Sequence, residues 1–184
     1  FFVPGGAPAD YTAIARQLEP PMSFSIDRGE FATQAKRSMD QAAKIVTYLR
    51  AAGDALEQLK PLRARESSPR WRANFDLIYA QVLAYEVRMY EYGAYLDGFI
   101  RQPKPIKNVL GPGRPTNRWY MQSRKETITD ERTKAIRDIS EATFRQILVE
   151  HEGTPYATRA QYELNRAFGM HLIEGHDAPN RIRP

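Results

Sequence analysis

The sequence predicts a mainly α-helical protein built on one long antiparallel helical hairpin, with a second, shorter helix pair and extended Pro/Gly-rich arms. Two apolar stripes between residues 31 and 99 repeat at alternating spacings of three and four, the period of a helix face. Hydrophobic residues make up 42% of the 184 residues, enough for a folded core. Pro and Gly gather in two other segments, 1–26 and 101–128. The length suits one domain.

Residues 1–26 are predicted to form an extended N-terminal arm. Pro4-Gly5-Gly6 and Pro20-Pro21 interrupt any regular element there. The chain begins with Phe1 and lacks the basic and apolar regions of a signal peptide. We therefore expect a processed or excised piece of a longer product.

The first long helix is predicted over residues 27–61. Asp27 is a suitable N-cap, and Glu30 completes a capping-box spacing. Pro61 is expected to end the helix. Its apolar stripe consists of Phe31, Ala35, Ser38, Ala42, Ile45, Leu49, Ala52, Leu56 and Leu59.

The second long helix is predicted over residues 68–100, because Ser68 can cap it and Pro69 fits the first helical position. Its stripe has the same length and spacing as the first, so the two should pack antiparallel. Leu49 and Val82 are expected to be buried there, and charged residues such as Lys44 and Arg88 to lie outside. The second stripe consists of Trp71, Phe75, Ile78, Val82, Tyr85, Met89, Tyr92, Leu96 and Phe99.

Residues 101–128 are predicted to be a long basic loop on the surface, because their Pro and Gly content is incompatible with a regular helix. Residues 101–125 hold no Asp or Glu, and their seven cations exceed the chain's net charge of +5, so the rest is net −2. Such a segment suits an acidic partner or an anionic polymer, although a solvated linker is an equally good interpretation. Trp119 is expected to mark where the loop docks. The candidate partner-binding residues are Arg101, Lys104, Lys107, Arg114, Arg118, Trp119, Tyr120, Arg124 and Lys125.

A second helix pair is predicted over residues 129–169, divided by Gly153 and the cap Thr154-Pro155, and followed by a polar tail over 175–184. The pair resembles one tetratricopeptide unit, which implies a local helix hairpin and not a repeat array. That resemblance rests on Phe144, Ile147, His151, Gly153-Thr154-Pro155-Tyr156-Ala157, Ala160 and Leu164.

Residues 66–168 also resemble the helical C-terminal regions of large planctomycete proteins that carry a von Willebrand factor A domain. The resemblance implies an exported, partner-binding protein, so a cell-envelope or exported location is favoured over a cytoplasmic one. The adhesion motif Asp-x-Ser-x-Ser is absent, and no adhesion metal site is implied. The segments that carry it are Ser67-Ser68-Pro69-Arg70-Trp71, Asn74-Phe75-Asp76-Leu77, Glu91-Tyr92, Thr116-Asn117-Arg118-Trp119, Arg124-Lys125-Glu126-Thr127 and Gly153-Thr154-Pro155.

Catalytic and metal motifs are not found in the sequence, and no cofactor is predicted. The chain has no Cys, which excludes thiolate ligands and disulfides. His151 at a helix end is interpreted as a complement to the helix dipole. His171-x-x-Glu174-x-His176 lacks the spacing of a helical zinc motif and is interpreted as part of a polar tail. An active site of acid and base assembled from distant residues stays open.

The leading functional hypothesis is a non-catalytic structural or protein-interaction domain belonging to a larger polypeptide or assembly. The first alternative is a module that binds an anionic polymer or acidic partner through residues 101–125. Nucleic acid is a less favoured polymer, because the rest of the chain is mildly acidic and no known nucleic-acid module appears. The second alternative is an enzyme with an unrecognised site. Apolar runs are too short to cross a bilayer.

Overall fold

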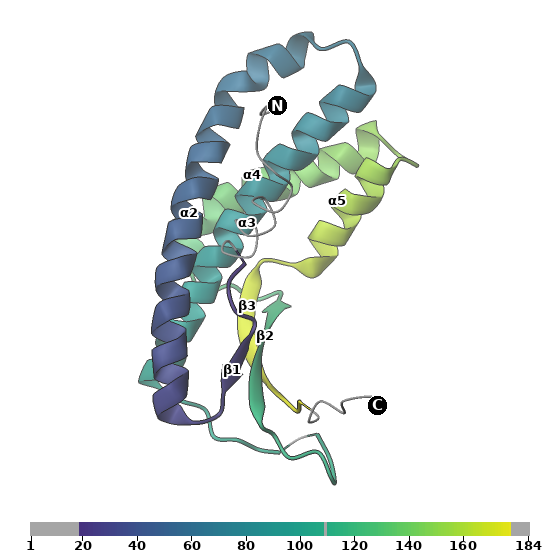
Figure 1. Ribbon diagram of the computed structural model, residues 1–184. Coiled ribbons are helices and arrows are strands. Elements are labelled where there is room, and N and C mark those ends of the chain that lie inside the picture. Colours follow the sequence, from purple (N-terminus) through teal and green to yellow (C-terminus); the bar gives the residue numbers. More distant parts are fainter. Residues whose placement is uncertain (1–18, 109, 178–184) are drawn as a thin grey trace, which may run out of the picture.

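The computed structural model in Figure 1 describes residues 19–108 and 110–177. It is mainly helical, as the sequence predicts, and adds a small sheet. α2 and α3 form the long hairpin, and α4 and α5 cover the side of α3 away from α2. The elements are β1 (Ser23–Ser25), α2 (Arg28–Arg65), α3 (Pro69–Arg101), β2 (Arg118–Arg124), α4 (Asp130–Glu150), α5 (Pro155–Arg166) and β3 (Gly169–Gly175).

The ends of the hairpin helices follow the sequence signals only in part. The Ser68 side chain makes no capping hydrogen bond at the start of α3, and the Asp27 amide donates to Ser25 Oγ at 3.1 Å, so the capping box with Glu30 does not form. The Asp27 carboxylate accepts a hydrogen bond from the amide of Glu30 at 2.9 Å, so the predicted cap of α2 is confirmed. Pro61 does not end α2, which continues to Arg65. The Arg63 guanidinium bonds the carboxylate of Asp76 on α3, and this contact holds the final turn against its neighbour.

The contact between α2 and α3 differs from the predicted uniform seam. Near the start of α2 the stripe is buried as expected, from Phe31 to Ile45. Leu49 and Val82 are only half-buried, and Lys44 is exposed. Toward the α2–α3 connection the two stripes are largely exposed, because α3 turns another face toward α4 instead. The residues of this face are Ala80, Ala84 and Val87.

α4 and α5 form the predicted second helix pair, and their apolar faces enclose a core with the middle of α3. Phe144 and Ile147 of α4 and Ala160 of α5 are fully buried in it. The Thr154 hydroxyl accepts from the amide of Ala157 and caps α5 as expected. The helix pair is predicted to reach residue 169, but α5 ends at Arg166 and Gly169 opens β3, where the backbone of Glu126 approaches too closely for any Cβ.

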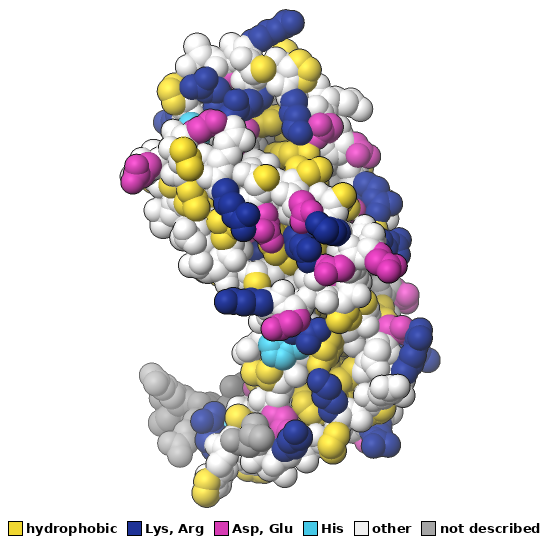
Figure 2. Space-filling view, turned by 180° about the vertical axis from the view of Figure 1, so that it is seen from behind, with side chains coloured by type: hydrophobic (Ala, Val, Ile, Leu, Met, Phe, Trp, Pro, Cys, Tyr) yellow, Lys and Arg dark blue, Asp and Glu magenta, His cyan; other side chains and the backbone are white. Residues whose placement is uncertain are grey.

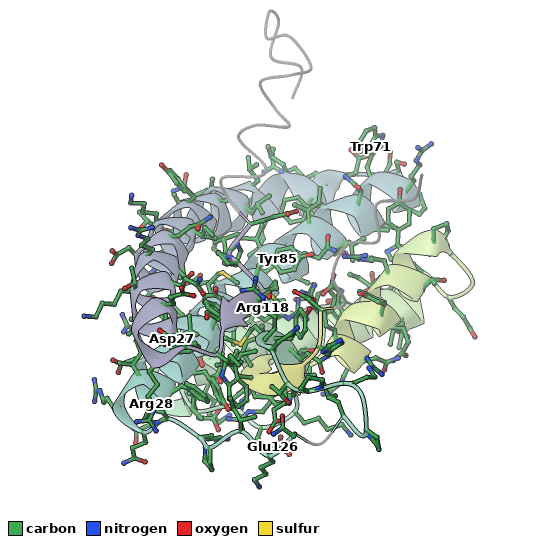
Figure 3. All side chains as sticks on the ribbon, turned by 60° about the horizontal axis from the view of Figure 1, so that its bottom comes forward. Asp27, Arg28, Trp71, Tyr85, Arg118 and Glu126 are labelled. Carbon is green, nitrogen blue, oxygen red and sulfur yellow. The ribbon has the colours of Figure 1, made fainter. Side chains whose placement is uncertain are left out.

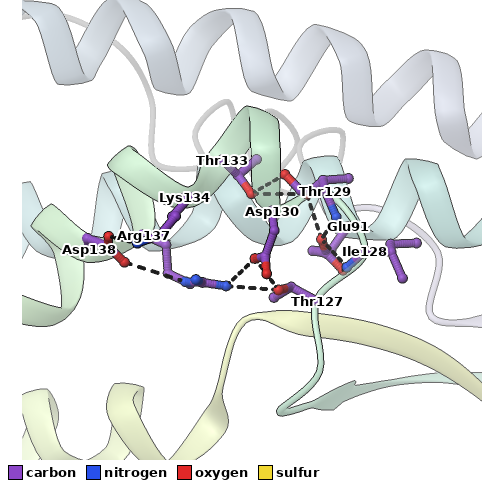
Figure 4. Close-up of polar contacts among 9 residues, drawn as sticks. All are labelled: Glu91, Thr127, Ile128, Thr129, Asp130, Thr133, Lys134, Arg137 and Asp138. Carbon is purple, nitrogen blue, oxygen red and sulfur yellow. Dashed lines mark hydrogen bonds and ion pairs between the residues drawn. The ribbon is translucent and has the colours of Figure 1, made fainter.

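Glu91 fastens the start of α4 to α3 (Figure 4). This carboxylate is fully buried and accepts from the amides of Ile128 and Thr129, at 2.7–3.0 Å, and from the Thr129 hydroxyl. The first amides of a helix have no partner within the helix, so a buried carboxylate satisfies them and complements the dipole. On the solvent-exposed side of this network, Arg137 forms an ion pair with Asp130.

A three-stranded antiparallel sheet in the order β1-β2-β3 occupies the end of the molecule opposite the α2–α3 connection. Phe24 pairs with Trp119, and Trp119 pairs with Glu174. The sheet corrects two predictions. The predicted arm contains β1, and the predicted loop contains the central strand β2. β3 ends at Gly175, where the predicted tail begins. Residues 1–18 and 178–184 lie outside the described residues.

Aromatic side chains form the core between the sheet and the lower halves of α2 and α3. The ring centroids of Phe31 and Phe99 lie 4.9 Å apart, and those of Phe99 and Trp119 lie 5.1 Å apart in an edge-on arrangement. Tyr92 is fully buried and donates its hydroxyl proton to the carbonyl of Pro21. This core draws on residues from the predicted N-terminal arm and the predicted basic loop as well as the hairpin.

Arg88 lies outside the α2–α3 contact, as predicted. It is nevertheless fully buried, because it packs against α5. Its guanidinium donates to Glu163 Oε2 at 2.8 Å and to the carbonyl of Ala167 at 2.9 Å. Burial acts to raise the pKa of Glu163, but the hydrogen bond and charge of Arg88 hold that pKa below its ordinary value. A buried ion pair with all its groups satisfied fixes how α5 sits on α3.

Candidate interaction surfaces

An exposed apolar groove lies at the α2–α3 connection, and we call it the tip groove. It measures about 340 Å³. Leu62 and Trp71 are 61% and 62% exposed, and Figure 3 shows Trp71 pointing away from the fold at the end of the molecule. The apolar lining consists of Leu56, Leu59, Leu62, Trp71, Phe75 and Ile78. Contiguous exposed apolar side chains mark interaction sites on folded proteins.

Cations outnumber acidic groups around the tip groove. Arg63, Arg72 and Glu66 line it directly, and Arg65 and Arg70 stand beside it on either side of the connection. Arg65 and Arg70 are exposed and form no ion pair within residues 19–108 and 110–177. Figure 2 shows several Lys and Arg side chains at this end of the molecule, with hydrophobic side chains between them. The surface therefore suits a partner that is both apolar and acidic.

A polar network beneath the tip groove joins three helices. The Arg63 guanidinium binds Asp76 of α3 and lies 3.4 Å from Glu150 of α4. Asp76, Glu150 and His151 place potential metal-ligating atoms within 4.8 Å of one another. Because the guanidinium already lies between both carboxylates, the arrangement acts as an ion-pair network. His151 is the C-cap of α4, as its interpretation from sequence requires, and its buried Nε2 has no hydrogen-bond partner in the described chain.

The predicted basic loop does not form one free cationic surface. Arg101 pairs with Asp97 at 2.6 Å, and Arg118 lies 3.4 Å from Asp177. Lys107, Arg114 and Lys125 are exposed without such a partner, whereas Lys104, which is also exposed, contacts Tyr95. About half of the segment's charge is therefore neutralised or turned toward the fold.

Lys104 and Arg124 converge on the ring of Tyr95. Their charged groups lie 5.6 and 5.5 Å from its centroid, and the Lys104 ammonium donates to the Tyr95 hydroxyl at 3.1 Å. Burial, together with the charges of Arg124 and Lys104, keeps the pKa of His171 below its ordinary value. Through their contacts with Tyr95, Lys104 and Arg124 contribute to packing of the sheet on α3.

Trp119 and Tyr120 are strand residues on opposite faces of β2. Trp119 is 5% exposed and sits in the aromatic core, so it docks the segment onto its own fold. Tyr120 stacks against Gly175, where an added Cβ would lie 2.0 Å from the ring. The predicted absence of regular structure in residues 101–125 is wrong for β2, although binding by the remaining exposed cations stays a prediction.

The motif His171-x-x-Glu174-x-His176 also belongs to the fold. Glu174 accepts from the Lys107 amide at 2.6 Å and from the hydroxyl of Thr116. The His176 Nδ1 lies 2.8 Å from the carbonyl of Pro115. These contacts tie β3 and His176 to the Pro-rich segment, and the interpretation of this motif as part of a polar tail is wrong.

Sequence reasoning missed the tip groove because it assigned Trp71 and Ile78 to a buried helix contact. A signal was present: Leu62 and Trp71 stand within a run holding Arg63, Arg65, Arg70 and Arg72. A buried helix contact rarely has so many cations beside it.

Comparisons with known proteins found no family model, no curated protein and no solved structure that matches this chain. Among the described residues, no helix is long and apolar enough to cross a membrane.

Proposed function

We propose that this chain is a non-catalytic interaction domain that binds a protein partner through the tip groove. The observation that carries the proposal is the exposure of Leu62 and Trp71 in a groove between two helix ends. Solvent contact of these side chains forfeits burial free energy of about 25 cal/mol per Å², which a partner would recover. Large aromatic anchors of this kind carry much of the binding energy in protein interfaces.

The charges around the groove support a partner segment of mixed character. An amphipathic helix with an apolar face and acidic flanks would place its apolar side chains in the groove and its carboxylates against Arg65 and Arg70. The Arg63–Asp76–Glu150 network beneath the groove joins the three helices on which it is built. A preformed groove loses little entropy on binding.

Site-specific photo-crosslinking in cells that produce the protein tests this proposal. A photoreactive residue at Leu62 or Trp71 should give a discrete adduct that mass spectrometry identifies. The same residue at Val149, which is 82% exposed on α4, is the matched control and should give none.

A double variant, Leu62→Ala with Trp71→Ala, should release the partner during native purification, whereas Val149→Ala should retain it. A monodisperse monomer without crosslinks from the tip would contradict the proposal.

The alternative function is binding of an anionic polymer through residues 101–125. Exposure of Lys107, Arg114 and Lys125 supports it, although Arg101 and Arg118 have acidic partners in the fold. Salt-sensitive retention on a heparin column should be lost when those three exposed cations become Ala. Retention that instead depends on Arg65 and Arg70 would assign the polyanion affinity to the tip.

Membership of a larger polypeptide or assembly, and export to the cell envelope, remain proposals that rest on the resemblance to the planctomycete proteins.

An unrecognised enzyme would need convergent acids and bases in a pocket. The candidate cluster of Asp76, Glu150 and His151 is bridged by Arg63, which favours a structural role for it.

A further inference from the structure

A second pocket lies at the opposite end of the molecule, and we call it the base pocket. It is enclosed by the start of α2, the end of α3, β2 and the residues that follow α3. Its volume is about 320 Å³, at the lower end of the range for small-molecule sites. The aromatic side chains of Phe31, Phe99 and Trp119 line it and are themselves packed in the core. One side of the pocket is therefore a packed aromatic wall, and the other consists of the exposed residues 103–106.

Only two of the side chains that line the base pocket are charged, and both are cationic. Arg28 belongs to the first turn of α2 and is exposed, and Lys104 follows α3. Arg28 forms no hydrogen bond or ion pair with any other described side chain. The Lys104 ammonium donates one of its three protons to the Tyr95 hydroxyl, and no other described side chain bonds it.

The nearest acidic residue in sequence is Asp27, which Figure 3 shows beside Arg28 at the start of α2. Its carboxylate caps the helix by accepting from Glu30, and it does not line the pocket. The remaining lining, from Ile26, Ala32, Ile100, Pro103, Pro105 and Ile106, is apolar. The pocket thus combines an apolar interior with an uncompensated positive charge.

We propose that the base pocket binds a small amphipathic anion, an apolar chain or ring that carries one carboxylate. The apolar part would lie against Phe31, Phe99 and Trp119. The carboxylate would meet Arg28 and Lys104, whose charges strengthen hydrogen bonds to it. This site is independent of the tip groove and does not rest on the proposed partner.

Trp119 supplies a direct readout of binding. In a Trp71→Phe background it is the chain's only Trp, and position 71 is exposed, so the fold should be unaffected. Titration with decanoate below its micelle concentration should change Trp119 emission in a saturable way. Decanol, which lacks the charge, should bind at least tenfold more weakly, and acetate, which lacks the chain, should give no change.

Charge variants separate specific binding from general adsorption. Arg28→Gln and Lys104→Gln should each weaken decanoate binding roughly five- to tenfold, about 1 kcal/mol each. Neither should change the weak binding of decanol. Lys107→Gln, an exposed cation outside the pocket lining, is the matched control and should leave decanoate affinity unchanged. Absence of a saturable signal, equal affinity for decanoate and decanol, or insensitivity to both pocket variants would overturn the proposal.

Discussion

The two tryptophans of this chain occupy opposite environments, and each environment is the reverse of what its sequence neighbourhood indicates. Trp71 stands in a regular helical stripe, yet it is 62% exposed at the tip. Trp119 stands among Pro, Gly and cations, yet it is 5% exposed in the aromatic core. Helical periodicity thus identifies which side chains share a face, whereas the partner of that face depends on the remaining elements.

The difference extends to the two ends of the molecule. At the base, segments distant in sequence converge on α2 and α3 and bury their apolar faces. At the tip, no described element covers the same stripes, and polar contacts of Arg63 keep the helices together there. One hairpin therefore has a closed core at one end and an open surface at the other.

Truncation of the base tryptophan should have the largest effect. Trp119→Ala removes a fully packed ring from contact with Phe99 and should lower the free energy of unfolding by about 3–5 kcal/mol. Denaturant unfolding followed by circular dichroism measures it, and helices should melt together with the sheet. A loss below about 1 kcal/mol would show that the base core does not depend on β2.

Removal of the guanidinium beneath the tip groove should have an intermediate effect. Arg63→Ala leaves the buried carboxylate of Asp76 without its partner, so we expect a loss of about 1–3 kcal/mol. Arg65→Ala, two residues later and exposed, is the matched control and should change stability by less than about 0.5 kcal/mol. Equal effects of the two variants in thermal unfolding would contradict a fastening role for Arg63.

The exclusion of water from the base core can be tested through the pH dependence of stability that buried Tyr92 confers. Burial raises its pKa to about 12 in the folded protein, whereas an unfolded Tyr has a pKa of about 10. The neutral hydroxyl is then favoured by folding, so its contribution is complete below pH ~10 and is lost as pH rises toward ~12. We expect a loss of about 1 kcal/mol at pH ~11 relative to pH ~9.

Tyr92→Phe provides the control for that pH dependence, since other groups also titrate in alkaline solution. The variant should be less stable at neutral pH by about 1 kcal/mol, because the carbonyl of Pro21 loses its donor. It should also show a smaller decline in unfolding midpoint above pH ~10. An identical decline in both proteins would mean that Tyr92 is reached by solvent.

The exposed tryptophan should contribute least. Trp71→Ala should alter the free energy of unfolding by no more than about 0.5 kcal/mol, because its ring has little burial to lose. The same substitution should reduce partner retention, so stability and binding respond to different tryptophans. A loss of stability comparable to that of Trp119→Ala would show that the tip is covered in solution.

The helices could be located from sequence because their determinants are local. The Asp27 and Thr154 caps, Pro at the first helical position and the spacing of three and four act within a few residues. The sheet could not be located in this way. Its strands come from three segments separated by whole helices, and the alternation from Trp119 to Met121 is too short to be recognised beside Pro and Gly.

The sequence by itself determined a mainly helical chain with a long hairpin and a second helix pair, because periodicity and capping are set by neighbouring residues. Only the tertiary structure decided which parts of those faces are buried. α4 takes the small-residue face of α3, the sheet closes the base, and the tip is left open. The two candidate sites follow from this long-range packing. The tip groove exists because distant segments leave a helix face uncovered, and the base pocket exists because distant segments meet around it.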